Sequence, residues 1–411
     1  MKQASPLTIT NGQVITPAGI VVGAVRLIDG VIDAVGADVA AHDGDTVLNA
    51  QGKLIAPGLV DLGVFAVDKP AFHFGGITRA ALMPDQSPPL DYPSRVAYVA
   101  KSGKPDLWVH PLAAATRGLE GAELAEIALM REAGARGVAT GRGWISDSGV
   151  MLRLCQYAAM LDLTVVAHAE DGDLVGDAAA TSGEIATRLG LPSAPAQAEA
   201  LALARDITLA EMSGARVHFR QVTTEAGFDL IRAAKARGVR VTCGITPAHF
   251  MLSDLASADF RTFTRLSPPL RSEADRLAAR AAIAEGVIDV ISSGHDPRGA
   301  EDKRLPFADA EPGMAGAETL LAMVLSLVRD DVIDLARAFA MLAEAPASLL
   351  GVKAGAIVPG YEADIAIIDP DAPWVIDRRK MEATGDNTPF DRSGAQGRVK
   401  ALIKGGVSIP I

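Results

Sequence analysis

The stretch Pro57-Gly58-Leu59-Val60-Asp61-Leu62-Gly63-Val64-Phe65 marks the point at which the character of the sequence changes. Pro57-Gly58 is a turn pair, and the apolar run after it is typical of a buried strand in a parallel sheet. Residues two apart on a strand point to the same side, so Gly63 and Phe65 are expected to face the same way. At the C-terminal end of a barrel strand, that direction leads into the site. We therefore interpret residues 57–65 as the first strand of a barrel, with Gly63 and Phe65 at its mouth.

Apolar strands alternate with helical segments over residues 57–349. Strands are predicted at 107–110, 137–139, 163–168, 217–219, 239–242 and 287–291. Segments rich in Ala, Leu, Glu and Arg lie between them at 122–133, 195–213 and 271–285, and their apolar residues have helical spacing. Repeated strand–helix units imply a parallel sheet, and their number favours a closed (β/α)8 barrel of the TIM type in the α/β class.

Both ends of the chain are β-rich instead. Before the barrel, strands are predicted at 7–10, 13–15, 21–28 and 31–35, with tight turns at Asn11-Gly12 and Asp29-Gly30. After residue 350 the same character returns at 363–369 and 399–406, while the polar segment 378–396 is expected to be a surface loop. We predict a small β-sandwich domain formed by both termini (1–56 and 350–411) that flanks a barrel domain at 57–349.

Composition narrows the class of protein. The 411 residues are 49% apolar and 22% charged, as expected for a globular chain. A formal charge of −11 argues against nucleic acid or an anionic membrane as a partner. Cys155 and Cys243 are the only cysteines, which excludes a disulfide framework and a cysteine zinc cluster. The first residues have no signal-peptide pattern and no apolar run reaches membrane-spanning length, so a cytoplasmic location is expected.

Short motifs continue along the chain after the first strand. They are Gly75-Gly76-Ile77-Thr78, Met83-Pro84-Asp85-Gln86-Ser87-Pro88, Val166-Ala167-His168-Ala169-Glu170-Asp171, Ala204-Arg205-Asp206-Ile207, Val222-Thr223-Thr224, Pro268-Pro269-Leu270-Arg271, Gly355-Ala356-Ile357 and Asn387-Thr388-Pro389-Phe390. In this order and spacing, and together with residues 57–61, they resemble the dihydroorotase branch of the amidohydrolase superfamily over nearly the whole chain. Fold does not imply chemistry, so the site residues are compared one by one.

The resemblance implies metal-dependent chemistry, because this family opens or closes the dihydroorotate ring with a zinc-bound hydroxide while an aspartate moves the proton. Such a site needs at least three protein ligands at strand ends. The family's His-x-His pair falls on Gly63 and Phe65 in this sequence, and the aspartate falls on Gly294. The third histidine is kept as His168, whereas the fourth falls on Gln221, next to Arg220. The ligand set and the proton carrier are therefore expected to be lost.

At the substrate-binding positions implied by the resemblance, the family's residues are also replaced by others. The arginine that holds the substrate carboxylate falls on Val67, and an asparagine of the second-strand loop falls on Asp85. A late histidine falls on Arg298, and a carboxylate that some relatives carry after the middle strand falls on Asp147. These positions, like those of the metal ligands, are interpreted as vestigial.

Seven histidines occur, and each one alone is more often a surface or core residue than a metal ligand. His168 is a single ligand, which is insufficient for a catalytic zinc. A weaker metal site made of His168, His295 and Asp147 is left open. Asp296, beside His295, is interpreted as a turn residue before Pro297.

The sequence thus predicts a dihydroorotase-like chain with no catalytic residue, no metal and no cofactor. By the resemblance, its implied role is that of the degenerate chains that act as structural partners of aspartate carbamoyltransferase in pyrimidine biosynthesis; a homo-oligomer is a further option. Two alternatives remain. One is an active dihydroorotase or other cyclic-amide hydrolase with a remodelled site, in which His168 or Asp147 is the base. The other is a small-molecule binding protein in which Arg220 and Arg298 hold an anion.

Overall fold

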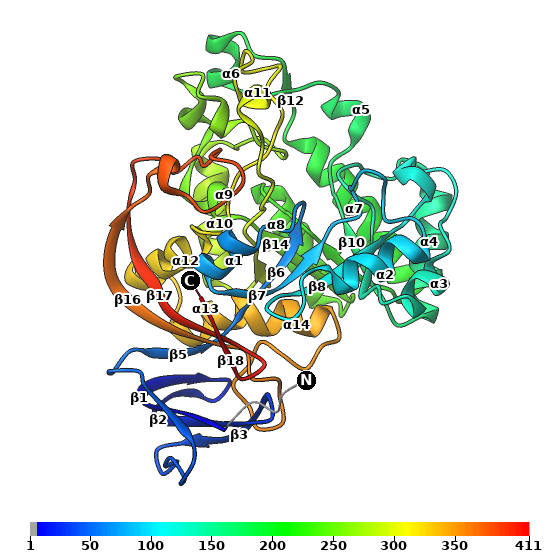
Figure 1. The fold of residues 1–411 in the computed structure, drawn as a ribbon. Helices are drawn as coiled ribbons and strands as arrows, with labels where there is room; N and C mark the ends of the chain where they lie inside the picture. Colours follow the sequence, from blue (N-terminus) through cyan, green and yellow to red (C-terminus); the bar gives the residue numbers. More distant parts are fainter. Residues whose placement is uncertain (1–5, 411) are drawn as a thin grey trace.

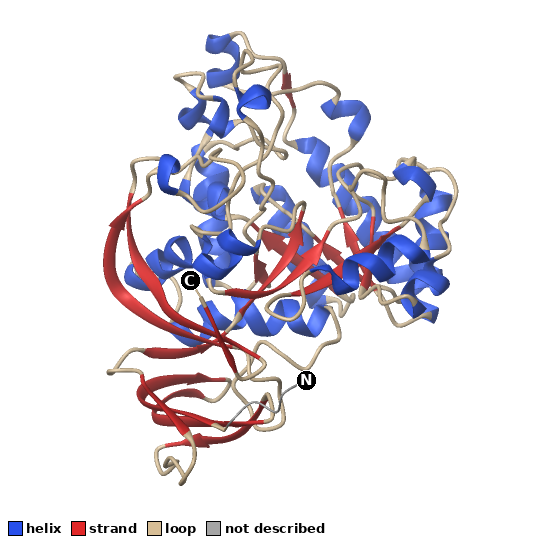
Figure 2. Cartoon of the chain, in the orientation of Figure 1, coloured by secondary structure: helices blue, strands red, loops and turns tan. Residues whose placement is uncertain are grey.

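The computed structural model describes residues 6–410, which form two eight-stranded sheets and one two-stranded sheet (Figure 1, Figure 2). The first large sheet is the barrel, and all of its paired strands are parallel. Its strands are β6 (Leu59–Val64), β7 (Ile77–Leu82), β8 (Trp108–Ala114), β9 (Gly137–Ala139), β10 (Thr164–Ala167), β13 (Arg216–Phe219), β14 (Val241–Ile245) and β15 (Val290–Ile291). The predicted fold class is confirmed.

Helices follow the barrel strands and surround them, as Figure 2 shows. The longer ones are α2 (Pro93–Ser102), α4 (Ser148–Met160), α7 (Gln197–Ser213), α8 (Glu225–Ala236), α10 (Glu273–Ala284) and α12 (Leu320–Arg329). The shorter ones are α1 (Lys69–Gly75), α3 (Ile127–Glu132), α5 (Gly172–Val175), α6 (Glu184–Leu189), α9 (Pro247–Met251), α11 (Ala300–Lys303), α13 (Leu335–Phe339) and α14 (Ala345–Leu349). The short pair β11 (Ala180–Thr181) and β12 (Ser193–Ala194) lies in the connection between β10 and α7.

The second large sheet is built from both ends of the chain. It contains β1 (Leu7–Thr16), β2 (Gly19–Ile28), β3 (Val31–Gly36), β4 (Thr46–Asn49), β5 (Leu54–Pro57), β16 (Ile365–Val375), β17 (Gly394–Lys404) and β18 (Val407–Ile409). The two ends meet where β5 pairs antiparallel with β16, at Ile55 opposite Ile367. The long curved strands β16 and β17 extend from this sheet along the side of the barrel, where β17 packs on α12 (Figure 1).

The ring of barrel strands is brought together between β15 and β6 by two contacts. The backbone N–H of Phe65 donates to the carbonyl of His295 at 2.9 Å. The carboxylate of Asp61, which is fully buried, accepts hydrogen bonds from the backbone and the hydroxyl of Ser293. Burial raises the pKa of Asp61, although both hydrogen bonds oppose this shift. These contacts hold the first and last strands in register at the end where the motifs lie.

Three local predictions are wrong. Asn11-Gly12 is not a hairpin turn, because β1 runs through it as one strand with a bulge between Ile9 and Gly12, and Asn11 has φ of 54°. The helix predicted at 122–133 begins only at Ile127. Residues 378–396 are not wholly a surface loop, because Asn387 is fully buried and its amide donates to the carbonyls of Asp296 and Gly313. At Asn11 and at Asn387 a tertiary contact overrides the local pattern.

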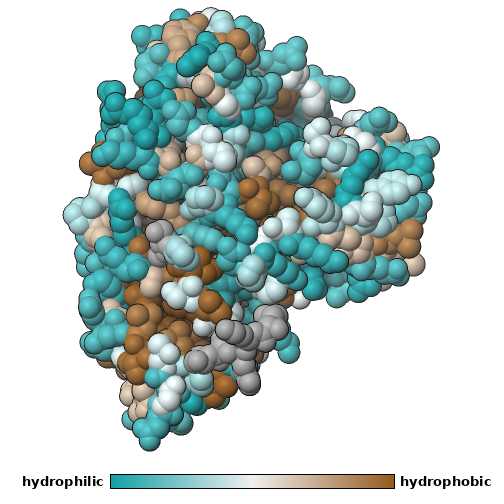
Figure 3. Space-filling view, viewed as in Figure 1, coloured by the Kyte–Doolittle hydropathy of each residue, from teal (hydrophilic) through white to brown (hydrophobic). Residues whose placement is uncertain are grey.

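The visible face of the molecule is mostly hydrophilic, and apolar side chains gather over the terminal sheet beside the barrel (Figure 3). Within residues 6–410 there is no helix that is both long enough and apolar enough to cross a membrane.

Candidate functional site

The residues singled out by the sequence collect at the mouth of the barrel, which we define as the edge formed by the C-terminal ends of its strands. Phe65 follows β6, His168 follows β10, Arg220 and Gln221 follow β13, and Gly294 lies shortly after β15. Parallel strands bring their C-terminal ends to one edge, so residues more than 200 positions apart become neighbours.

Arg220 occupies the centre of the mouth. Its side chain is buried, with a residue exposure of 5%. Nη1 donates to Oε1 of Gln221 at 3.2 Å, and Nη2 lies 3.5 Å from Nδ1 of His168. Burial, with the nearby charge of Arg142, lowers the pKa of Arg220 to about 10, so the guanidinium remains charged at neutral pH. A protein cation therefore lies between the two positions where the resemblance places the third and fourth histidine ligands.

Phe65 fills the space above this arginine. Its ring centroid lies 5.1 Å from the guanidinium carbon of Arg220 and 3.7 Å from that of Arg142. Both distances are in the range of cation–π contacts, which are strongest where water is excluded. The aromatic side chain thus provides a negative π-face for two cations.

Asp296 completes this arrangement and is more than a turn residue, which corrects the sequence interpretation. Its Oδ2 accepts hydrogen bonds from Arg142 at 2.7 Å and from Arg298 at 3.0 Å. Arg298 also donates to the carbonyl of Pro312. Because its charge already faces Asp296, Arg298 is not free to hold an external anion together with Arg220.

The remaining cavity at the mouth has a volume of only about 30 Å³. Phe65, Arg142, Arg220, Gln221, His249 and Asp296 contribute to its lining. This is room for about two or three water molecules, whereas sites for small organic ligands occupy about 300–1,000 Å³. A ring-sized substrate therefore does not fit unless Phe65 or an arginine moves.

The two glycines at positions where the resemblance places metal ligands leave little room for a larger side chain. Gly63 lies at a register shift in β6 with φ of 95°, and a Cβ atom there would approach Cδ of Arg220 at 3.1 Å. Gly294 has φ of 59°, and its Cβ would lie 2.9 Å from Cγ2 of Thr246. A side chain at either position meets both backbone strain and a neighbouring group. Neither position can take a larger side chain unless its neighbours shift.

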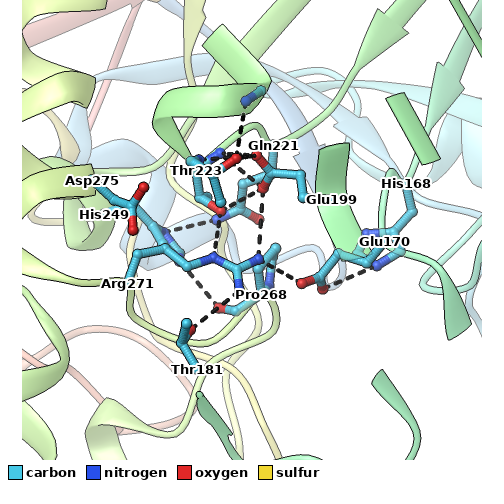
Figure 4. Close-up of polar contacts among 12 residues, drawn as sticks. His168, Glu170, Thr181, Glu199, Gln221, Thr223, His249, Pro268, Arg271 and Asp275 are labelled. Carbon is cyan, nitrogen blue, oxygen red and sulfur yellow. Dashed lines mark hydrogen bonds and ion pairs between the residues drawn. The ribbon is translucent and has the colours of Figure 1, made fainter. Parts of the chain in front are cut away.

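His168 belongs to a buried ionic network at the side of the mouth (Figure 4). Its Nε2 lies 3.5 Å from Oε2 of Glu170, whose Oε1 accepts from Arg271 at 2.6 Å. Burial would raise the pKa of Glu170, but the hydrogen bond from His168 and the charge of Arg271 outweigh it and lower this pKa to about 2.

Glu199, on α7, extends the same network and is fully buried. It accepts hydrogen bonds from the backbone and hydroxyl of Thr223 and Thr224, and lies 3.6 Å from Arg271. Burial raises the pKa of Glu199 even so. The network clamps the ends of β10 and β13 to α7, so its polar groups are occupied by one another.

The other predicted positions lie away from the cavity. Val67 is exposed at 37%, and Asp85 accepts a hydrogen bond from the backbone of Arg142. Asp147 caps helix α4 by accepting from the backbone N–H of Val150. His295 is fully buried, with Nε2 3.6 Å from Asp68. His168, His295 and Asp147 therefore serve three different contacts and do not form a cluster.

These side chains do not fit a catalytic zinc ion, which requires three protein ligands. Among residues 6–410, no group of three or more His, Cys, Asp or Glu side chains is placed to hold a metal. At the five positions of the resemblance, only His168 offers a good ligand atom, and the guanidinium of Arg220 beside it would repel a cation.

Sequence reasoning missed Arg142, and it placed Asp296 outside the site. Arg142 follows β9 by three residues, at the same edge as the other site residues. A search of every segment after a predicted barrel strand would have found it, since 137–139 was already recognised as a strand. No family motif marks this position.

The amidohydrolase family model matches residues 99–409, and the chain belongs to this family. Within it, the chain is a dihydroorotase-like member. It is 39% identical to a dihydroorotase of Pelotomaculum thermopropionicum, over 97% of each chain. It is also 35% identical to a dihydroorotase-like protein of Pseudomonas aeruginosa, over 97% of this chain and 98% of that one.

Solved structures share the architecture. The L-hydantoinase of Arthrobacter aurescens superimposes with a TM-score of 0.89 at 24% identity, over 98% of this chain and 96% of that one. The dihydropyrimidinase of Brevibacillus agri superimposes with a TM-score of 0.85 at 21% identity, over 98% of this chain and 95% of that one. At this level of identity the likeness is one of fold.

Proposed function

We propose that this protein is a non-catalytic dihydroorotase-like chain that lacks zinc and acts as a structural partner of aspartate carbamoyltransferase in pyrimidine biosynthesis. The observation that carries this proposal is that protein side chains occupy the mouth of the barrel. Arg220 and Phe65 fill it, and a cavity of about 30 Å³ remains.

The missing chemistry follows from the residues. A zinc-bound hydroxide needs a metal held by at least three ligands, and the transferred proton needs a carrier. Gly63, Phe65 and Gly294 supply neither a ligand nor a carrier. Asp296 is the nearest carboxylate in sequence to Gly294, but its Oδ2 already accepts hydrogen bonds from two arginines.

The partner role rests on the family resemblance, and two features support it. The barrel and the sheet from both termini are intact, so the chain keeps the scaffold on which a partner surface would lie. The carboxylate of Asp296 pairs with two arginines and little space remains at the mouth, which suits a protein whose task requires a stable fold and no substrate access.

An active cyclic-amide hydrolase is the second candidate. It is favoured by the relatives of 35–39% identity that carry the name dihydroorotase. For this activity Phe65 would have to leave the mouth and a new base would have to reach the substrate. The pair His168–Glu170 is the nearest acid–base pair for such a role.

Elemental analysis and a turnover assay separate the two candidates. The purified protein is incubated with zinc, desalted and assayed with dihydroorotate, with an active dihydroorotase treated in parallel. We expect zinc well below one equivalent and no turnover. Stoichiometric zinc together with turnover would show that the chain is an enzyme.

Sedimentation velocity tests the partner role separately. The protein is mixed at micromolar concentration with aspartate carbamoyltransferase from the same source, and with bovine serum albumin as the control. A joint species with the transcarbamoylase alone is expected. If the two proteins sediment independently, the partner role is wrong, whatever the result of the metal analysis.

A further inference from the structure

The opposite end of the barrel carries a second, larger cavity. We define the base as the region at the N-terminal ends of β7, β8 and β9. The cavity there has a volume of about 410 Å³, which lies within the range of small-ligand sites. Its lining includes Arg79 of β7, Trp108 and His110 of β8, Arg136 just before β9, and Lys353 after α14.

The charge of this cavity is opposite to that of the chain. Four cationic side chains line it (Arg79, Lys104, Arg136 and Lys353) against one carboxylate, Glu362. The whole protein carries −11. A concave surface with several charges of one sign concentrates counter-ions of the other sign.

Most of these cations are not neutralised internally. Arg79 pairs with Glu362 and Asp364. Among residues 6–410, by contrast, Lys104, Arg136 and Lys353 have no carboxylate within the 4.0 Å limit of an ion pair. All three are exposed, so their charged ends are accessible from solvent.

His110 lines the cavity at the base and lies close to its cationic side chains. Its residue exposure is 9%, and its Nε2 lies 3.4 Å from Nη1 of Arg79. Burial first, and then the charges of Arg79, Arg136, Lys404 and Lys104, lower the pKa of His110 to about 3. Two further contacts bring cations to one indole: Nζ of Lys104 lies 4.0 Å and Nζ of Lys404 4.4 Å from the ring centroid of Trp108.

We propose that the base is a binding site for a small oxyanion with two or more negative charges, of the phosphate or polycarboxylate class. The cavity supplies the volume, three unneutralised cations supply the charge, and the guanidinium of Arg136 supplies a planar donor for a phosphate or carboxylate group. The site is independent of the proposed function, because it shares no residue with the mouth.

Isothermal titration calorimetry tests the site with inorganic pyrophosphate in one arm and citrate in the other. One-to-one binding of either probe is expected, and the arm that binds more tightly identifies the class. The triple variant Lys104→Ala/Arg136→Ala/Lys353→Ala is expected to weaken binding by at least about 10-fold, because charge-assisted contacts are lost.

The matched control is Arg188→Ala/Arg304→Ala/Arg392→Ala, which removes the same charge from side chains that are 71%, 73% and 93% exposed. This control is expected to change the affinity for the probe by less than about 2-fold, because salt screens the charge of exposed side chains that lie far from the cavity. An equal loss in both triple variants, or no binding of either probe to the wild type, would overturn the proposal. Lys353→Ala alone serves if the triple variant does not fold, and a partial loss of affinity is then expected.

Trp108 gives an independent readout. A ligand that draws Lys104 away from the indole should change the tryptophan fluorescence. Trp108→Phe should abolish this change. A fluorescence change that persists in Trp108→Phe would place the ligand elsewhere.

Discussion

The mouth and the base of this barrel differ in what their charges contact. At the mouth, Arg142 and Arg298 face Asp296, and Arg220 faces Phe65 and His168, with about 30 Å³ left open. At the base, a cavity of about 410 Å³ has three cations that no carboxylate of residues 6–410 neutralises.

This difference contrasts a filled end of the barrel with an open one within a single fold. A barrel enzyme keeps polar groups at the mouth unpaired, because the substrate is their partner. Here Asp296 pairs with Arg142 and Arg298, whereas the buried guanidinium of Arg220 contacts Phe65, Gln221 and His168 and its Nε has no hydrogen-bond partner among the described residues. The solvent-exposed cations Lys104, Arg136 and Lys353, which have no carboxylate partner among the described residues, lie at the other end, where the fold does not place its chemistry.

The largest effect is expected at the mouth, from Arg271→Met. This change leaves Glu170 and Glu199 buried without their cation, and should lower the free energy of unfolding by about 3–5 kcal/mol. Urea denaturation followed by circular dichroism measures it.

Two controls accompany this variant. Arg276→Met removes a partly exposed partner of Glu273 and should cost less than about 1 kcal/mol. Arg220→Met leaves no buried carboxylate behind and should cost less than Arg271→Met. Equal costs for all three would mean that the network around His168 has no special structural role.

Restoring the histidine pair should have the next largest effect. Gly63→His/Phe65→His introduces strain at φ of 95° and a contact with Arg220, and should lower the free energy of unfolding by about 2–3 kcal/mol. Gly63→Ala separates backbone strain from the bulk of the imidazole.

No turnover of dihydroorotate is expected from the double variant in added zinc, because Gly294 still provides no proton carrier. Turnover would show that another group at the mouth moves the proton, and the mouth would then have to be considered an active site.

At the base, His110 should make stability depend on pH. The pKa of His110 is lowered to about 3 from an ordinary 6.5, so the unfolded chain takes up the proton first as the pH falls. The contribution of neutral His110 to the free energy of unfolding should therefore be complete above pH 6.5. It should decrease as the pH falls toward 3, by about 2 kcal/mol at pH 5.

Urea denaturation at pH 7.5 and pH 5 measures this term in the wild type and in His110→Gln. The difference between the two pH values should be smaller in the variant. An unchanged difference would mean that His110 is protonated in the folded protein.

The smallest effect is expected for Lys353→Ala, at the rim of the base. Its ammonium has no internal ion-pair partner among the described residues, so its removal should change the free energy of unfolding by less than about 0.5 kcal/mol. A larger loss of stability, measured in the same urea titration, would mean that the cations of the base are structural, like those of the mouth.

Much of the fold could be predicted from local pattern. The strands at 137–139, 163–168 and 217–219 were recognised because buried parallel strands are continuous apolar runs. The bulge at Asn11 could not be predicted in this way, because Asn-Gly is also the usual sequence of a hairpin turn. Only the pairing of β1 with β2 and β5 decides between a bulge and a turn.

The candidate site also has a part that the sequence predicted and a part that it did not. The glycines at 63 and 294 and the glutamine at 221 were noted from spacing alone, as were the strand ends on which they lie. The contact of Arg142 with Phe65 and the pairing of Asp296 were not predicted, because these side chains come from loops whose course depends on tertiary packing.

By itself, the sequence determined which residues follow each barrel strand, because strand periodicity and the parallel topology bring strand ends to one edge. It thereby determined that four of the five ligand positions implied by the resemblance offer no good metal-binding atom. Only the tertiary structure decided what replaced them. The direction and burial of Arg220, the volume left beside Phe65 and the unneutralised charge at the base depend on distances between segments far apart in the chain, and no local pattern encodes those distances.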